Sequence, residues 1–401
     1  MGNIIPKETV IEKCLHMLDI VNYRHPYSDH GAKKLLTGQA ILLLVEAQLR
    51  RHDSLWDISE NLRAKDTLQK LVELDAIHAS SVHRKLETLP REVLQELCHA
   101  VLQRVDTYHQ QKSGIPDLGK LHIIDASKIS LPKIAGEWAY CSKHENSIKI
   151  HMRYVLADEK TAYPDRFVLS TGAVSDQEGA IELVVDPAAT YVFDRGYINY
   201  SHFHQWMTDS IPFVARVKAN SKLKVIKERS VPDDSSLVLD ADVELKNPKT
   251  DETFMLRLVE YKDDEGKVYR VVTNRWDLTA FEVSEIYRYR WKIELFFKWM
   301  KQHLKVVKLY NHKPEAVWNQ IYIAMIAYGL CELIRIETQT EKSNWDILKL
   351  LRIYWHDVWD CFLNALHRRA CRSSKGRKKK AKKGRPRKHP KKLKAVQIVV
   401  K

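Results

Sequence analysis

Residues 287–301 read YRYRWKIELFFKWMK. An α-helix advances about 100° per residue, so polar side chains three, seven and fourteen positions after Tyr287 fall within about 60° of it. These side chains are Arg290, Glu294 and Lys301. The adjacent sector is apolar and consists of Ile286, Ile293, Phe296, Phe297, Met300 and Leu304. The sequence therefore predicts one amphipathic helix that buries its apolar flank and presents a narrow polar stripe to a cleft.

The polar stripe has two interpretations. A carboxylate among cations at a buried edge suits a metal ion beside phosphate groups. Charged side chains at these spacings also form ion-pair ladders on solvent-exposed helix faces, and such ladders are common. From this helix alone the solvated ladder is the more frequent arrangement, so the rest of the chain has to decide.

An all-α domain is predicted for residues 1–113, where apolar residues recur at helical spacing. Helices are expected at 35–49, 55–62, 67–74 and 90–108. Residues 75–86 could form a short helix that places His83, Arg84 and Lys85 against DNA, as in a helix-turn-helix. The alternative is an ordinary capped helix within a bundle.

After residue 114 the pattern changes to that of a mixed α/β sheet with an antiparallel start. Strands are expected at 120–124, 147–156, 166–171, 190–193 and 212–217, helices at 176–184 and 201–207, and turns at 157–160 and 163–165. A β-rich insertion is expected at 219–274. The stripe-bearing helix then begins near Thr279, and further helices are expected at 314–336 and 344–367.

Two acidic residues follow predicted strands, Asp125 and Asp194. A carboxylate at a strand end projects into the crevice beyond the sheet. Together with Glu294, these acids could hold two divalent cations about 3.5–4 Å apart for phosphoryl transfer. Magnesium prefers oxygen ligands, so such a set needs no histidine or cysteine. The alternative for each aspartate is a turn or cap, and Asp186, before Pro187, is a competing acid that looks like a turn residue.

Two motifs carry a resemblance to a known family. Asp194-Arg195-Gly196-Tyr197, together with Tyr287-x2-Arg290-x3-Glu294-x6-Lys301, resembles the signature of DDE transposases of the bacterial insertion sequence 4 family. The β-rich segment before the Glu294 helix is similar to theirs as well. The resemblance covers about residues 121–308.

This resemblance implies a ribonuclease H-like core with a metal-binding catalytic triad of Asp125, Asp194 and Glu294. It also implies that phosphates of the element end are contacted by Tyr287, Arg290 and Lys301. Strands would be cut by water and joined through the freed 3′-hydroxyl. One departure concerns the first acid: Asp125 is followed by Ala126-Ser127-Lys128, where a small polar pair is expected.

The resulting divisions follow from the pattern and the resemblance together. They are an all-α N-terminal DNA-binding domain at 1–113, the first part of the catalytic core at 114–218, the β-rich insertion at 219–274, the rest of the core with the Glu294 helix and the C-terminal helices at 275–367, and a disordered basic tail at 368–401.

The basic charge of the chain is concentrated in that tail. The formal net charge is +15, and residues 368–394 contain sixteen Lys or Arg and no acid, so the remainder is close to neutral. Within the tail, Gly384-Arg385-Pro386-Arg387-Lys388 resembles an AT-hook core, which would lay Arg385 and Arg387 into a narrow minor groove. A generic polybasic tail is the alternative. Either would bind phosphates by counterion release.

The six cysteines form no C-x-x-C pair, which favours a reducing cytoplasm over a zinc or disulfide framework. The apolar run at 321–330 is too short to span a bilayer, so no membrane partner is expected. We predict a cytoplasmic, nucleoid-associated DNA transposase that uses two Mg²⁺ ions, for which Mn²⁺ can substitute. It would act as a homodimer on terminal inverted repeats and target DNA. The alternatives are a catalytically inactive, transposase-derived DNA-binding regulator and a metal-dependent nuclease of the same fold.

Overall fold

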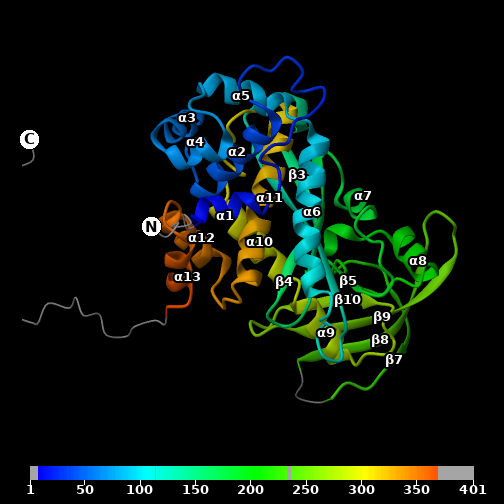
Figure 1. Cartoon of the computed structure of the whole chain (residues 1–401). Coiled ribbons are helices and arrows are strands. Elements are labelled where there is room, and N and C mark those ends of the chain that lie inside the picture. The colour runs from blue at the N-terminus through cyan, green and yellow to red at the C-terminus, as the bar shows by residue number, and fades with distance from the viewer. Residues whose placement is uncertain (1–7, 113, 233–235, 369–401) are drawn as a thin grey trace, which may run out of the picture. The chain divides into compact units, whose positions relative to one another are not determined.

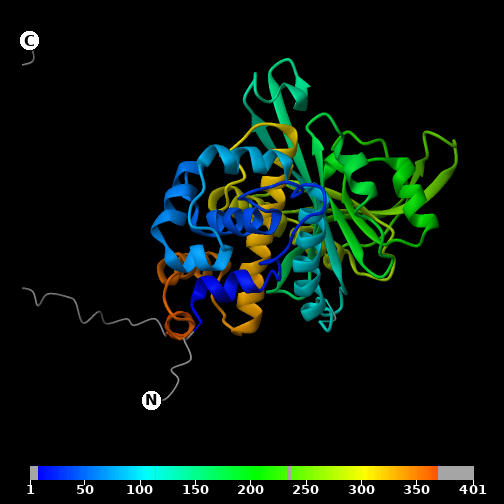
Figure 2. The same ribbon diagram turned by 45° about the horizontal axis from the view of Figure 1, so that its top comes forward.

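The computed structural model describes residues 8–112, 114–232 and 236–368, and the described residues up to 366 belong to one compact unit. Helices of the N-terminal and C-terminal segments lie together on one side of this unit, and the green strands lie on the other (Figure 1; Figure 2). This is the predicted mixed α/β class, with helices before and after a large sheet.

The first hundred or so residues are helical, as predicted. The elements are α1 (Val10–His16), α2 (Thr37–Arg50), α3 (Leu55–Ala64), α4 (Asp66–Val72), α5 (Ala79–Thr88) and α6 (Arg91–His109). Helix α2 is the centre of this group, because every residue from Thr37 to Leu49 is buried. It packs against α11 (Pro314–Glu337), which comes from the other end of the compact unit. The division at residue 113 stays a prediction.

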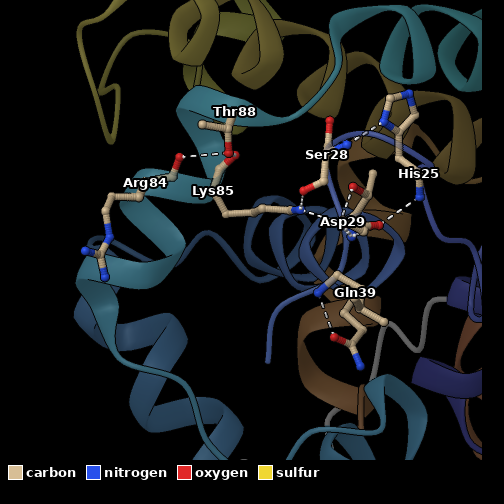
Figure 3. A network of polar contacts seen from close by, with 9 residues as sticks. His25, Ser28, Asp29, Gln39, Arg84, Lys85 and Thr88 are labelled. Atoms are coloured by element: carbon tan, nitrogen blue, oxygen red, sulfur yellow. Dashed lines mark hydrogen bonds and ion pairs between the residues drawn. The ribbon is translucent and has the colours of Figure 1, made fainter. Parts of the chain in front are cut away.

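Lys85 on α5 points into this helical region (Figure 3). Its ammonium lies 2.5 Å from Asp29, and the two side chains are 9% and 4% exposed. Asp29 also accepts hydrogen bonds from the Thr37 N–H at the start of α2 and from the His25 N–H. Arg84 points away from this network and is exposed. Lys85 is therefore a structural residue and is not available to DNA as the helix-turn-helix interpretation proposed.

The strands form one mixed sheet with the order β2-β3-β1-β5-β6-β10-β9-β8-β7, and β4 pairs with β3 beside this path. They are β1 (Leu121–Leu131), β2 (Tyr140–Ser142), β3 (Glu145–Leu156), β4 (Ala162–Thr171), β5 (Thr190–Phe193), β6 (Phe213–Arg216), β7 (Lys224–Glu228), β8 (Leu237–Lys246), β9 (Thr253–Lys262) and β10 (Val268–Thr273). β1 and β3 are antiparallel, whereas β1, β5 and β6 are parallel. The parallel strands are connected through α7 (Asp176–Ile181) and α8 (Tyr200–Thr208), consistent with a ribonuclease H-like core.

The prediction that the first strand ends at Asp125 is wrong, because β1 continues to Leu131. The added residues stay paired with β3, and Leu131 lies opposite Asn146. Side chains from Ser127 onward alternate between buried and exposed, which is the period of a strand with one solvated face. What ends near Asp125 is the pairing with the parallel neighbour β5, which reaches only Ile124.

The turn predicted at residues 163–165 is also wrong, because these residues lie inside β4. Pro164 pairs with Tyr154 of β3 next to an irregularity in the register. Proline is tolerated at such a bulge on an edge strand, because its missing N–H breaks no ladder hydrogen bond there.

The β-rich segment predicted at 219–274 is present as β7 to β10. It continues the core sheet rather than forming a separate one, since β10 pairs with β6 and places Thr273 opposite Val214. A buried ion pair between Arg257 and Asp240 joins β9 to β8 at 2.8 Å. The boundaries of the insertion remain predictions.

The predicted stripe-bearing helix is two helices, α9 (Ala280–Arg288) and α10 (Trp291–His303). Thr279 caps the first with its side chain, at the predicted start. Between the helices, the Arg290 N–H donates to the Tyr287 carbonyl at 3.1 Å, three residues back. This 3₁₀-type turn interrupts the α-helical ladder, as short tight turns often do at functional positions. The predicted apolar flank is buried as expected.

The last helices of the described chain follow α11. The single helix predicted at 344–367 is two helices, α12 (Asn344–Tyr354) and α13 (Trp359–Leu366). The backbone of the N-terminal segment bonds to the residues between them, because the Val10 N–H donates to the Asp357 carbonyl at 2.9 Å. Helix α11 is long and apolar enough to cross a membrane by length and composition, contrary to the estimate from the run at 321–330. Its most apolar window is completely buried in the protein, so α11 serves as the central core helix.

Candidate active site

Asp125 and Asp194 come from neighbouring parallel strands. The register between β1 and β5 pairs Ile124 with Phe193, so the two acids follow at adjacent positions. Because β5 ends at Phe193 while β1 continues, Asp194 stands at a strand end in the region where parallel sheets form ligand crevices. The strand register alone thus brings together two of the three predicted acids.

Asp194 is held by side chains from two other elements. The Tyr287 hydroxyl of α9 donates to its Oδ1 at 2.9 Å, and Arg216 Nη1 of β6 lies 3.6 Å from the same oxygen. Burial would raise the pKa of Asp194, but the Arg195 N–H and the charge of Arg290 oppose this effect. With the Tyr287 and Arg216 contacts added, the pKa lies below its usual value, so the carboxylate stays ionised.

Arg290 connects the other two acids. Its Nη1 lies 3.3 Å from Asp125 Oδ2, and its Nη2 lies 2.5 Å from Glu294 Oε1. The Arg290 side chain is only 10% exposed, and its buried Nε has no hydrogen-bond partner among the described residues. The structure therefore gathers acids from β1, the end of β5 and α10 around one buried guanidinium.

The electrostatic environment of Asp125 is opposite to that of Asp194. Burial raises the pKa of Asp125 to about 6, and the negative charges of Asp194 and Glu294 add to this increase. The Ala126 N–H, which donates to Asp125 Oδ1 at 2.8 Å, and the Arg290 charge only partly offset it. Crowded, partly desolvated carboxylates of this kind are stabilised by a cation.

The polar stripe combines both interpretations made from the sequence. Arg290 and Glu294 form the i, i+4 ion pair of the ladder, but the arginine is buried and also contacts Asp125. Lys301 Nζ donates to the Lys128 carbonyl of β1 at 2.8 Å, and burial lowers the pKa of Lys301. The stripe therefore faces the sheet and is not a solvated ladder.

The donor set matches the chemistry of a divalent ion such as Mg²⁺. Asp125, Asp194 and Glu294 would offer oxygen ligands, and burial together with the neighbouring acids raises the pKa of Asp125. In the described part of the chain, no three Asp, Glu, His or Cys side chains form a ready metal-ligand group in this arrangement. The Arg290 guanidinium instead lies between Asp125 and Glu294 and supplies the compensating charge.

Arg216 and Tyr269 belong to this site and were missed by the sequence analysis. The register of β5 with β6 pairs Phe193 with Ala215, which makes Arg216 the neighbour of Asp194. The Arg216 guanidinium lies 4.6 Å from the centre of the Tyr269 ring, and that ring lies 6.1 Å from the Tyr287 ring. A charged residue at the end of the otherwise apolar strand 213–216 was the available clue.

The other sequence candidates lie elsewhere. Asp186 accepts the Ala188 N–H at 2.9 Å in an exposed loop, which is the turn role expected for the competing acid. Arg385 and Arg387 lie outside the residues that the structure describes.

Comparisons with known proteins show the family to which the chain is similar. The family described as "Transposase DDE domain" matches residues 118–330, which include all three acids. A putative transposase of Sinorhizobium fredii is 30% identical over 57% of this chain and 64% of its own length. A probable transposase for an insertion sequence element of Geobacillus stearothermophilus is 27% identical over 68% of this chain and 71% of its own length. A putative transposase for an insertion sequence element of Synechocystis is 26% identical over 48% of this chain and 56% of its own length. The match thus spans less than two thirds of the Sinorhizobium and Synechocystis proteins.

Proposed function

This chain belongs to the family of DDE transposases, and from that membership we propose that it binds the ends of an insertion sequence and catalyses DNA strand cleavage and strand transfer. The observation that carries the proposal is the convergence of Asp125, Asp194 and Glu294 from three elements around Arg290. Phosphoryl transfer depends mainly on positioning and on charge stabilisation, and this cluster offers both.

The three acids would hold two divalent ions, Mg²⁺ or a substituting Mn²⁺, which supply activation of the attacking oxygen and stabilisation of the leaving oxygen. The chain's own residues orient this set. Tyr287 holds Asp194 through its hydroxyl, and Arg290 holds Asp125 and Glu294 in the absence of DNA. Water or a 3′-hydroxyl would then attack a phosphodiester positioned beside these acids.

Tyr287, Arg290 and Lys301 would form the phosphate clamp for the element end. Arg290 suits this role because guanidinium groups bind phosphate oxygens in pairs, and its two Nη atoms already lie beside Asp125 and Glu294. Lys301 lies beside the part of β1 that follows Asp125. Its ammonium donates to the Lys128 carbonyl, and this bond holds the ammonium in place. Contacts of this kind position DNA without reading its sequence.

The remaining features extend the same proposal. The partners would be double-stranded DNA at the terminal inverted repeats and at the target, within a homodimer in the cytoplasm at the nucleoid. The N-terminal helices at 1–113 would add DNA contacts, and the tail with Arg385 and Arg387 would add salt-sensitive affinity. The catalytic core would comprise 114–218 and 275–367, separated by the insertion at 219–274.

The test uses the full chain, Mg²⁺ and a DNA duplex that carries the element's terminal repeats. We expect the parent protein to nick and join this DNA, and Asp194→Ala and Glu294→Ala to lose about a hundredfold or more of both activities. Asp186→Ala is the matched control, because this acid lies in the exposed loop before β5 and should remain fully active. Equal activity of all three variants would refute the triad. End binding without cleavage by the parent would favour the inactive regulator.

A further inference from the structure

A cavity of about 770 Å³ opens beside Asp194. It lies between the 3₁₀ turn at 195–197, the start of α8, the loop after β6 and the β8–β9 turn at Pro248. The described residues that line it include Asp194 but none of Tyr287, Arg290 and Lys301. Asp194 therefore contacts Tyr287 of the phosphate clamp and also lines this second space, hereafter the Asp194 cavity. Its volume is in the range of sites that bind small molecules.

The lining of the Asp194 cavity favours an anionic ligand. Arg195 and Lys218 line it, both are exposed, and neither forms an ion pair with another described residue. By contrast, Arg216 and Lys149, which also lie near the acids, are both paired with carboxylates. Asp194 is the single acid in the described lining. Free cations beside an acid already held by Tyr287 suit a phosphate backbone.

The walls of the cavity are organised by hydrogen bonds. Asn199 caps α8 and donates through its side-chain amide to Gln177 Oε1 at 3.2 Å, and Gln177 donates to the Ile198 carbonyl at 2.7 Å. At the loop after β6, Arg270 donates to the Ala219 carbonyl at 2.7 Å and so holds the loop that carries Lys218. A preformed wall loses little conformational entropy when a ligand binds.

Strand transfer requires two DNA segments at one set of acids. The 3′ oxygen of the element end forms a bond to a phosphorus of the acceptor strand, and the bond from that phosphorus to its own 3′ oxygen breaks. The attacking hydroxyl loses a proton, and the leaving oxygen takes one up. Because the attacking and leaving oxygens are roughly in line, they lie on opposite sides of that phosphorus, and the element end and the acceptor strand need separate binding surfaces.

We propose that the Asp194 cavity binds the acceptor strand, with Lys218 contacting its phosphates while the clamp holds the element end. This assignment rests on the proposed function. It predicts that joining to acceptor DNA depends on Lys218, whereas cleavage of the element end depends on the clamp and much less on Lys218.

The experiment compares Lys218→Glu, Lys218→Arg and the matched control Lys222→Glu, which changes an exposed lysine of the same loop that does not line the cavity. Cleavage is measured on an uncut element end, and joining is measured with a pre-cut end and a supercoiled plasmid. We expect Lys218→Glu to lower joining about tenfold relative to cleavage, through loss of a phosphate contact and added repulsion. Lys218→Arg should restore joining, and Lys222→Glu should change the ratio less than about twofold.

An unchanged ratio of joining to cleavage in Lys218→Glu would overturn the assignment. So would an equal loss of both activities, which would mean that the cavity holds the element end itself, or an equal effect of Lys222→Glu, which would mean nonspecific charge. Because Lys218 is exposed, we expect no folding defect, and thermal unfolding of each variant checks this. A parent protein that cleaves no element end would refute the proposed function, a result distinct from any change confined to joining.

Discussion

Replacing Asp125 by Asn is expected to stabilise the protein in metal-free buffer at pH 8. Burial raises the pKa of Asp125 from its ordinary value of 3.8 to about 6. In the unfolded chain this carboxyl loses its proton near pH 3.8, whereas the folded protein retains it up to about pH 6. The folded state therefore loses stability as the pH rises between these values, and the full penalty is present above about pH 6.

The size of the effect follows from that difference of about 2 pH units. At 1.36 kcal/mol per unit, the ionised Asp125 costs about 3 kcal/mol of unfolding free energy at pH 8. Asn has nearly the same shape and carries no charge. Its one amide oxygen can keep either the hydrogen bond from Arg290 or the one from the Ala126 N–H, so the net gain should be smaller than about 3 kcal/mol. Near pH 4 the advantage of Asn should largely vanish, because the native carboxyl is then protonated.

The opposite change is expected at Asp194. Its lowered pKa means that the charged form stabilises the fold above about pH 4, and that this stability is lost as the pH falls through the folded-state pKa. Asp194→Asn weakens the hydrogen bond from Tyr287, so it should destabilise the metal-free protein at pH 8 by about 1–3 kcal/mol.

Thermal and urea unfolding with EDTA at pH 8 and pH 4.5 would measure both changes. Asp125→Asn should raise the midpoint by roughly 5 °C at pH 8, and Asp194→Asn should lower it. Asp186→Asn is the control, because this acid caps an exposed turn that Asn also caps. If Asp125→Asn unfolds at a lower temperature than the parent at pH 8, the desolvation argument for this site is wrong.

Three further predictions concern the fold. Lys85→Ala should cost about 3–5 kcal/mol, because it leaves a buried partner charge, whereas Arg84→Ala should stay within about 0.5 kcal/mol in urea unfolding; equal costs would contradict the buried ion pair. Burial holds the pKa of His122 well below 6.5, so below that pH the unfolded chain binds a proton that the folded chain excludes. His122→Phe should therefore reduce the loss of unfolding free energy between pH 6.5 and 5 by up to about 1.4 kcal/mol per pH unit. An unchanged dependence of the unfolding free energy on pH would refute this. Gly329→Ala should cost about 1–3 kcal/mol, since its Cβ would lie 2.4 Å from Val101 Cγ1 across the α11–α6 contact, and an unchanged urea midpoint would contradict that packing.

The sequence predicted the parts of this protein that depend on local periodicity. Apolar spacing identified the N-terminal helices, the strand at 190–193 and the helix start at Thr279, and all are present. The buried flank of α10 was predicted for the same reason, because the side chains of a helix repeat every 3.6 residues whatever surrounds them. Breaks within predicted helices were missed where a distant segment causes them. An example is the break before α13, where the backbone of residues 9–11 bonds to the backbone of residues 355–358.

The candidate acids were recognised because acidic residues after apolar segments stand out in the sequence, but their arrangement required the tertiary structure. Asp125 is not at a strand end, and it meets Asp194 only through the parallel register of β1 with β5. Arg216 reaches the same place through the register of β5 with β6. Hydrogen bonds between strands far apart in the chain set these registers, and no local pattern encodes them.

The polar stripe at residues 287–301 shows the same division. Helical spacing by itself determined that Arg290 and Glu294 are neighbours, and a short sequence encodes this because four residues make about one turn. Only the tertiary structure decided that the pair is buried against Asp125 and that Lys301 lies along β1. Burial depends on which surface packs over a side chain, and that surface comes from strands more than a hundred residues earlier in the chain.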